Sequence, residues 1–208
     1  LSTLEVIKDV SNKLVADPVN AERVRFGVWG YRDSIEITPD LEYVAKNYTE
    51  NLQKHDEFAK TLATVKATTV DSGDYPEDVF TGVGTALDET VWSENAMRFM
   101  ILVGDAPAHE AGHEKNTSGK NAAVLRKLAN QQKVYLFAMH LENPRAVRFN
   151  DTTAQQFGDL SFNSGATESA YHVIPTTEPE GYAKAAKLLA DSLLSYLKQT
   201  EAASSKVP

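Results

Sequence analysis

Residues 98 to 107 read RFMILVGDAP, an apolar run that ends in a glycine, an aspartate and a proline. Apolar residues without alternation, over the length of a strand, are typical of a strand covered on both faces of a parallel sheet. The run therefore predicts a central strand at Arg98–Gly104. Asp105 would then lie just beyond the carboxyl end of this strand, where open α/β sheets bind their ligands.

The segments on either side of this strand alternate between helical and extended patterns. Apolar residues at helical spacing cover residues 2–15, 54–65, 79–91, 120–132, 151–160 and 178–198. Extended patterns cover residues 24–31, 133–141 and 171–174, and weaker ones predict edge strands at 34–38 and 41–47. This alternation predicts an α/β fold, a Rossmann-like three-layer sandwich with a mostly parallel central sheet and helices on both faces. The domain is expected to span residues 1–198, with a linker or tail at 199–208.

The composition narrows the classes of function. The 208 residues include 21 Lys and Arg against 29 Asp and Glu, a formal net charge of −8. Nucleic-acid binders need a basic face, so a nucleic-acid partner is not expected. The absence of cysteine excludes disulfides and thiolate zinc sites. No apolar run approaches the roughly 20 residues that span a bilayer, so we expect membrane attachment only through a parent polypeptide.

Two acidic loops supply candidate binding residues. One contains Asp105, and the other precedes a predicted helix and contains Asp71, Asp74, Glu77 and Asp78. Carboxylates at this edge of a sheet can bind a metal ion. They can equally cap a helix or complement its dipole without any metal, an alternative that would account for Glu77 and Asp78.

Several stretches share the pattern of one known family. They are VRFGVWGYRD (24–33), SGDYPEDVFTGVGTAL (72–87), RFMILVGDAPAH (98–109) and VYLFAMHL (134–141). Together they resemble bacterial von Willebrand factor A domains, and nearly all of residues 1–198 can be placed. Residues 41–48, 125–141 and 154–161 are most similar to the C-terminal domain of type VI secretion-associated serine/threonine protein kinases. This resemblance implies a larger bacterial signalling protein and a periplasmic or otherwise extracytoplasmic location, with the cytoplasm as the alternative.

The same resemblance implies a non-catalytic module that binds a partner protein. Such domains hold a divalent cation, usually Mg²⁺, between an Asp-x-Ser-x-Ser loop, a Thr or Asp of a second loop and an Asp of a third. By position, Asp105 matches the third-loop ligand and Asp74 the second-loop ligand. The expected partner-binding residues are Asp105, Asp74, Glu77, His109 and Arg32.

The first strand of the resembled family and its Asp-x-Ser-x-Ser loop have no counterpart in the sequence. In that fold, Val24–Tyr31 and Arg98–Gly104 would flank this strand and would be left with unpaired backbone groups. Each such group costs roughly 1–3 kcal/mol if buried, against a net stability of about 5–15 kcal/mol. Because the chain starts at Leu1 without a methionine, we expect an excised piece of a larger protein. An upstream strand, or a segment of a neighbouring molecule, should fill the gap.

Residues 109–113, HEAGH, match the HExxH pattern of zinc peptidases and define an alternative function, a zinc-dependent hydrolase. Such enzymes need His109 and His113 on one face of a regular helix, with Glu110 polarising the metal's water. A nearby proline, an internal glycine and the polar residues that follow argue against a helix. The two histidines are therefore expected on an exposed loop beside Asp105.

Overall fold

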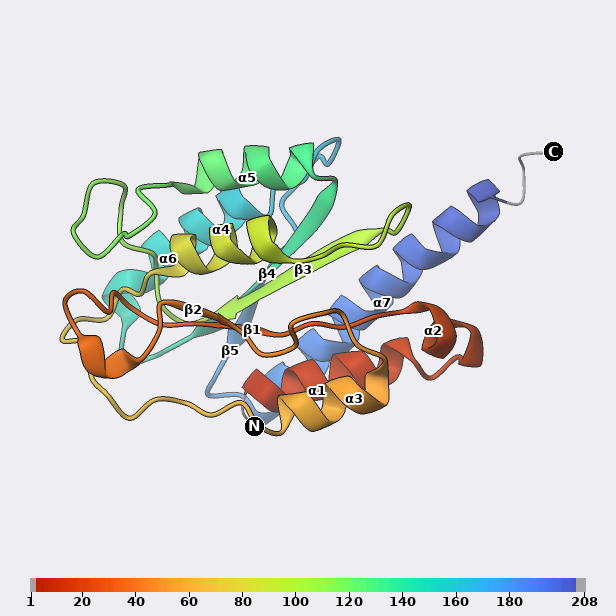
Figure 1. The fold of residues 1–208 in the computed structure, drawn as a ribbon, viewed down its shortest axis with the longest axis horizontal. Helices are drawn as coiled ribbons and strands as arrows, with labels where there is room; N and C mark the ends of the chain where they lie inside the picture. Colours follow the sequence, from red (N-terminus) through yellow and green to blue (C-terminus); the bar gives the residue numbers. More distant parts are fainter. Residues whose placement is uncertain (1–2, 205–208) are drawn as a thin grey trace.

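A three-stranded parallel sheet forms the centre of the fold in the computed structural model, which describes residues 3–204 (Figure 1). Its strands, in the spatial order β3-β4-β5, are β3 (Arg98–Gly104), β4 (Val134–Glu142) and β5 (Tyr171–Pro175). Ile101 lies opposite Phe137, and Leu141 lies opposite Ile174. Helices cover both faces of β4, so most of its side chains are buried. A mixed α/β fold with a parallel sheet is thus confirmed.

The six predicted helices are present, together with a short helix at Pro18–Arg23 that was not predicted, and three of the helices begin at a side-chain cap. The helices are α1 (Thr3–Leu14), α2 (Pro18–Arg23), α3 (His55–Leu62), α4 (Val79–Glu89), α5 (Ala122–Gln131), α6 (Val147–Leu160) and α7 (Pro179–Ser204). The side chains of Asp17, Asp78 and Asn121 each accept a hydrogen bond from a backbone N–H in the first turn of α2, α4 and α5. Capping is therefore confirmed for Asp78.

The last helix, α7, is longer than its sequence pattern indicated. It continues to Ser204, into the segment expected to be a linker or tail, and residues 205–208 lie outside the described residues. Despite its 26 residues, α7 is not apolar enough to cross a membrane, and neither is any other helix within residues 3–204.

Two apolar clusters pack on the sheet because successive strand residues point to opposite faces. One cluster joins β3 and β4 to α4, α5 and α6, with Leu136 and Phe157 fully buried. The other joins the strands to α1 and α7, with Met139 and Leu189 fully buried.

A separate antiparallel pair, β1 (Trp29–Tyr31) and β2 (Ala45–Asn47), lies beside this sheet (Figure 1). The predicted strand at 24–31 is therefore regular only at its end, although Phe26 still pairs with Gln53. The predicted edge strand at 34–38 is wrong, because these residues form a turn closed by the Thr38 N–H on the Ser34 carbonyl, 3.0 Å. The one predicted at 41–47 is shortened, because a 3-10 turn at Pro39–Leu41 precedes it.

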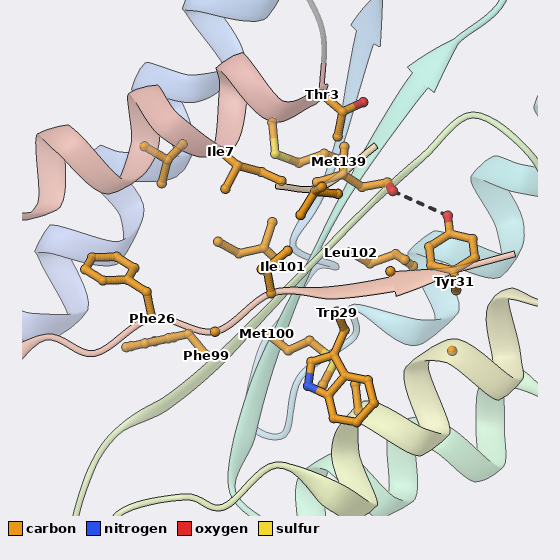
Figure 2. A pocket seen from close by; sticks show the side chains of 18 of the residues that line it. Thr3, Ile7, Phe26, Trp29, Tyr31, Phe99, Met100, Ile101, Leu102 and Met139 are labelled. Carbon is orange, nitrogen blue, oxygen red and sulfur yellow. Dashed lines mark hydrogen bonds between the residues drawn. The ribbon is translucent and has the colours of Figure 1, made fainter. Parts of the chain in front are cut away.

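The strand β3 lies at an edge of the parallel sheet, so the predicted central position is wrong within residues 3–204. Only Leu102 of this strand is fully buried, and its other residues are half-buried. The segment 24–31 lies across from β3 without pairing with it, and a cavity of about 1190 Å³ separates the two (Figure 2). The strand has the expected apolar faces, but one of its backbone edges has no partner strand.

Candidate functional site

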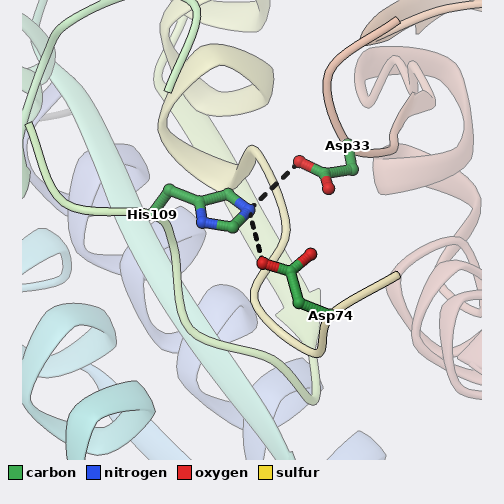
Figure 3. Close-up of side chains that lie close together, drawn as sticks. All are labelled: Asp33, Asp74 and His109. Carbon is green, nitrogen blue, oxygen red and sulfur yellow. Dashed lines mark hydrogen bonds and ion pairs between the residues drawn. The ribbon is translucent and has the colours of Figure 1, made fainter. Parts of the chain in front are cut away.

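Loops from three parts of the chain meet beyond the carboxyl ends of β1 and β3. Asp33 follows β1, Asp74 lies in the loop before α4, and His109 lies in the loop after β3. Figure 3 shows the three side chains pointing toward one another. One ligand atom from each lies within 4.8 Å of the others, so the group could hold a metal ion. With Lys115, these residues are called the charged cluster below.

Backbone pairing between two loops holds His109 in place. The Glu77 N–H donates to the Pro107 carbonyl at 3.0 Å, and the His109 N–H donates to the Glu77 carbonyl at 3.3 Å. The Asn116 side-chain amide donates to the His109 carbonyl at 2.9 Å. As a result the His109 side chain is only 3% exposed, which corrects the expectation of an exposed loop histidine. His113 is exposed as expected.

Lys115 places its ammonium group between the two aspartates of the cluster. Its Nζ donates to Asp33 Oδ2 at 2.7 Å, to the Ser72 carbonyl at 2.7 Å, and to Asp74 Oδ1. These acceptors satisfy all of the ammonium's N–H groups. Burial alone would lower the pKa of Lys115, but the hydrogen bonds to Asp33 and Asp74 outweigh burial and raise the pKa above its ordinary value. The ammonium group of Lys115 therefore lies between the two carboxylates, at the position that a bound metal ion would occupy.

Asp33 is the most buried carboxylate of the cluster, with a side chain only 1% exposed. Besides Lys115, it contacts His109 Nε2 through Oδ1 at 3.1 Å. Because an ionised carboxylate can only accept, this geometry assigns the proton to Nε2. Asp74 Oδ2 lies 4.0 Å from the same nitrogen. A metal ion bound through His109 Nε2 would therefore require the other imidazole tautomer, with the proton on Nδ1, and would have to separate Lys115 from the carboxylates.

Asp105, the other predicted metal ligand, is not part of this three-residue group. It accepts a hydrogen bond from the Tyr75 hydroxyl at 3.0 Å through Oδ2, and its carbonyl accepts one at 3.1 Å. Tyr75 is itself fixed by stacking on Phe149, with ring centroids 5.0 Å apart. Burial, and then the charge of Asp105, raise the pKa of Tyr75 to about 12. Of the predicted pair, the structure brings only Asp74 into the cluster.

Glu77 lies half-buried between the cluster and Asp105. Burial first, and then the neighbouring carboxylates Asp33, Asp105 and Asp74 in that order, raise the pKa of Glu77 to about 7, while Lys115 acts in the opposite direction. The raised pKa of Glu77 therefore reflects its burial first and the surrounding carboxylates second. The helix-capping interpretation fits its neighbour Asp78 and leaves Glu77 as a member of the site's electrostatic environment.

Arg32, expected to bind a partner, lies outside the charged cluster. Its guanidinium donates to the Leu41 carbonyl and to Glu42 Oε2 at 3.0 Å, and it sits 4.1 Å above the centroid of the Tyr43 ring. Side chains of consecutive residues in an extended segment point to opposite sides. Because Arg32 points away from the cluster, the next residue, Asp33, points into it.

Sequence reasoning missed two members of the cluster, Asp33 and Lys115. The position of Asp33 directly after a predicted strand could have identified it by the rule that selected Asp105. Lys115 lies in a polar loop with no pattern of its own, and its contact with Asp33 joins residues 82 positions apart. No local signal could have found it.

The HEAGH segment does not form the helix that a zinc peptidase needs. Residues 111 and 112 lie in a turn, with the His113 N–H donating to the Glu110 carbonyl at 3.0 Å. The rings of His109 and His113 stack at 4.5 Å and 12°. Glu110 accepts a hydrogen bond from the Gln156 side chain at 2.8 Å. The predicted absence of a helix here is confirmed.

Comparison with known proteins does not assign the chain to a family. No protein-family model matches the chain, and no curated protein matches its sequence. The likeness to von Willebrand factor A domains therefore rests on the sequence stretches quoted above.

Proposed function

We propose that the chain is a non-catalytic protein-binding module of the von Willebrand factor A type, with its three-layer, Rossmann-like arrangement. The partner protein binds the loops beyond the carboxyl ends of β1 and β3. The main support is that Asp33, Asp74, His109 and Lys115, which come from distant parts of the chain, converge at this edge. Ligands of open α/β sheets bind at the same edge.

The ligand types of the charged cluster suit a divalent cation. Asp33, Asp74 and His109 would hold it, and two carboxylates with one imidazole suit Mn²⁺ better than Mg²⁺, which prefers oxygen ligands alone. When bound, the ion offers a coordination position to a carboxylate of the partner. Asp105 adds negative charge nearby and favours a cation at the cluster without being its ligand.

Lys115 gives this site a competitor for the cation. Its ammonium uses the same carboxylates of Asp33 and Asp74 that an ion would need. A divalent ion brings two charges where Lys115 brings one, so the ion gains from the unneutralised charge around Glu77. Competition with Lys115 predicts weak cation binding, because the ion must displace the ammonium from both carboxylates and needs the His109 tautomer with a free Nε2.

Selection of binders from a displayed peptide library tests the proposed function. We expect peptides with an essential Asp or Glu, captured in millimolar Mn²⁺ and released by a chelator. Asp33→Asn and Asp74→Asn should abolish their capture, whereas Asp88→Asn, which changes an exposed carboxylate paired with Lys120 at 3.5 Å, should not. Peptides that bind all four proteins equally, with or without Mn²⁺, would contradict the proposal.

We also propose that this module belongs to a larger bacterial signalling protein, such as a type VI secretion-associated serine/threonine kinase, and that it lies in the periplasm. The sequence resemblance supports this placement. Protease treatment of spheroplasts that carry the epitope-tagged parent protein should degrade the module. Protection equal to that of a cytoplasmic marker would place it in the cytoplasm instead.

A further inference from the structure

One face of the antiparallel pair β1–β2 carries cationic and aromatic side chains close together (Figure 1). Gly30 lies opposite Lys46 in the register of the two strands. The backbone N–H groups of Arg32 and Tyr48 extend this pairing past the strand ends, at 2.8 and 3.0 Å to carbonyls of the facing segment. Because opposite residues and residues two apart share one face of a ladder, all four residues lie on the same face.

Gly30 makes room for two tyrosines on this face. A Cβ at Gly30 would lie 3.1 Å from the Tyr48 ring and 3.2 Å from the Tyr43 hydroxyl, so both side chains lie directly against the strand. The two hydroxyl oxygens are 2.7 Å apart, and the rings meet edge to face, with centroids 6.3 Å apart and an interplanar angle of 83°. Each ring therefore fixes the position of the other.

Two cations lie over these rings. The Arg32 Cζ is 4.1 Å from the centroid of the Tyr43 ring. The Lys46 Nζ is 4.8 Å from the centroid of the Tyr48 ring and 5.6 Å from that of Tyr43. All three distances are within the roughly 6 Å over which a ring face attracts a cation. The rings thus hold both cations in place without neutralising them. Arg32, Tyr43, Lys46 and Tyr48 are called the cation–tyrosine row below.

The cation–tyrosine row carries more positive charge than its neighbouring carboxylate balances. Glu42, with a side chain 74% exposed, accepts a hydrogen bond from Arg32 Nη1 at 3.0 Å. The Arg32 Nε and Nη2 groups have no such partner in the described part of the chain, and the exposed Lys46 forms no ion pair there. Two cations and one carboxylate leave one positive charge, on a chain whose net charge is −8.

We infer that the cation–tyrosine row is a binding site for an acidic side chain, Asp or Glu, of a partner protein. The planar edge of a guanidinium matches a carboxylate through two parallel hydrogen bonds, and the Arg32 Nε and Nη2 groups are free to form them. Lys46 adds a second donor. The single unbalanced positive charge matches one carboxylate, whereas a phosphate group would leave an excess of negative charge.

The composition of the row is also typical of a protein interface. Tyrosine and arginine are enriched among the residues that contribute most binding energy in such interfaces. The Tyr43 and Tyr48 rings are already held by each other and by Gly30, so little side-chain freedom remains to be lost on binding.

This site differs from the charged cluster in position and in chemistry. Arg32 points away from the cluster, and the row holds its own cations, so binding needs no metal ion. The inference goes beyond the proposed cation-dependent contact and does not rest on it.

Titration of a defined peptide, followed by NMR in the presence of a chelator, tests the inference. The probes are acetyl-Gly-Leu-Glu-Trp-Gly-amide, the same peptide with Gln for Glu, and the same peptide with phosphoserine for Glu. The Glu peptide should shift the amide signals of Gly30, Lys46 and Tyr48 of the isotope-labelled chain and saturate them with a Kd of about 10 mM or below. The Gln peptide should not. A Gln peptide that binds equally, or no saturable shift with the Glu peptide, would overturn the inference.

Four single variants locate the binding. Lys46→Gln should weaken the Glu peptide by about fivefold, Lys46→Glu should abolish its binding, and Lys46→Arg should retain it. Lys60→Gln is the matched control, because it removes one exposed positive charge on α3 and should change nothing. Equal effects of Lys46→Gln and Lys60→Gln would show nonspecific attraction and overturn the site.

Two further arms separate the remaining alternatives. Binding of the phosphoserine peptide more than about tenfold tighter than the Glu peptide would contradict the assignment to a carboxylate. Asp74→Asn, which changes the charged cluster, should leave binding of the Glu peptide unchanged, and loss of binding there would contradict a separate site. Capture of library peptides in Mn²⁺ tests the charged cluster by itself, so failure of either site is distinguishable from failure of the other.

Discussion

Replacing Lys115 by methionine should destabilise the protein strongly, because it leaves a buried carboxylate without its cation. Asp33 has a side chain only 1% exposed and would keep only its contact with His109, whereas Asp74 is 38% exposed and can be solvated by water. Breaking a buried ion pair by removing one partner costs about 3–5 kcal/mol, and an exposed pair contributes about 0–1 kcal/mol. We therefore expect Lys115→Met to lose about 3–5 kcal/mol, nearly all of it through Asp33.

Urea unfolding at neutral pH measures this loss. Lys120→Met is the matched control, because Lys120 pairs with the exposed Asp88 at 3.5 Å and should lose about 1 kcal/mol or less. Adding Asp33→Asn to Lys115→Met removes the uncompensated charge and should restore part of the stability. A loss for Lys115→Met equal to that of the control, or no recovery in the double variant, would refute the assignment of Lys115 as the internal cation of the cluster.

Three further outcomes are expected. The pKa of Glu77 is raised from 4.5 to about 7, so the folded state holds this proton more tightly than the unfolded chain does. The stability that protonated Glu77 contributes is lost as pH rises through about 7. Glu77→Gln should therefore make the urea midpoint depend less on pH between about pH 5 and 8. Gly82→Ala should lower the thermal midpoint by the equivalent of about 1–3 kcal/mol, because its Cβ would meet the Tyr31 Cβ at 2.5 Å. The Asn163 side chain accepts a hydrogen bond from the Leu136 N–H at 2.8 Å and donates one to the Leu136 carbonyl at 2.9 Å. Asn163→Ala should therefore lower the free energy of unfolding in urea by about 1–3 kcal/mol for each backbone group left unpaired. A total loss below about 1 kcal/mol would argue that water replaces the Asn163 side chain.

The helices and the parallel strands were predictable because local pattern and packing agree there. The apolar run of β4 is buried on both faces, and α4 begins where Asp78 caps it. The ends of the strand at 24–31 were harder to predict. One edge of this segment faces the cavity, so the segment lacks the backbone pairing that would make it a regular strand. The position of β3 at a sheet edge could not be predicted from its own residues. Apolar side chains indicate that both faces of a strand are covered, but they do not indicate whether both of its backbone edges are paired.

The candidate site was predictable only in part. The family resemblance selected Asp74 and His109, which the structure brings together with Asp33. The rule that ligands bind beyond strand ends selected Asp105, which accepts a hydrogen bond from Tyr75 instead. Lys115 could not be found, because its role depends on contacts between residues far apart in the chain. A single sequence shows which loops carry charge, but it does not show which side chains of those loops meet.

Calorimetric titration of Mn²⁺ into the chain and into Lys115→Met is the most direct test of the proposed cation site. Both proteins should bind one ion, and Lys115→Met should bind at least about tenfold more tightly, a difference of about 1.4 kcal/mol, because the competing ammonium is gone. Asp33→Asn should abolish the binding heat. An absence of binding in both proteins, or equal affinity in Lys115→Met and the unchanged chain, would contradict the account.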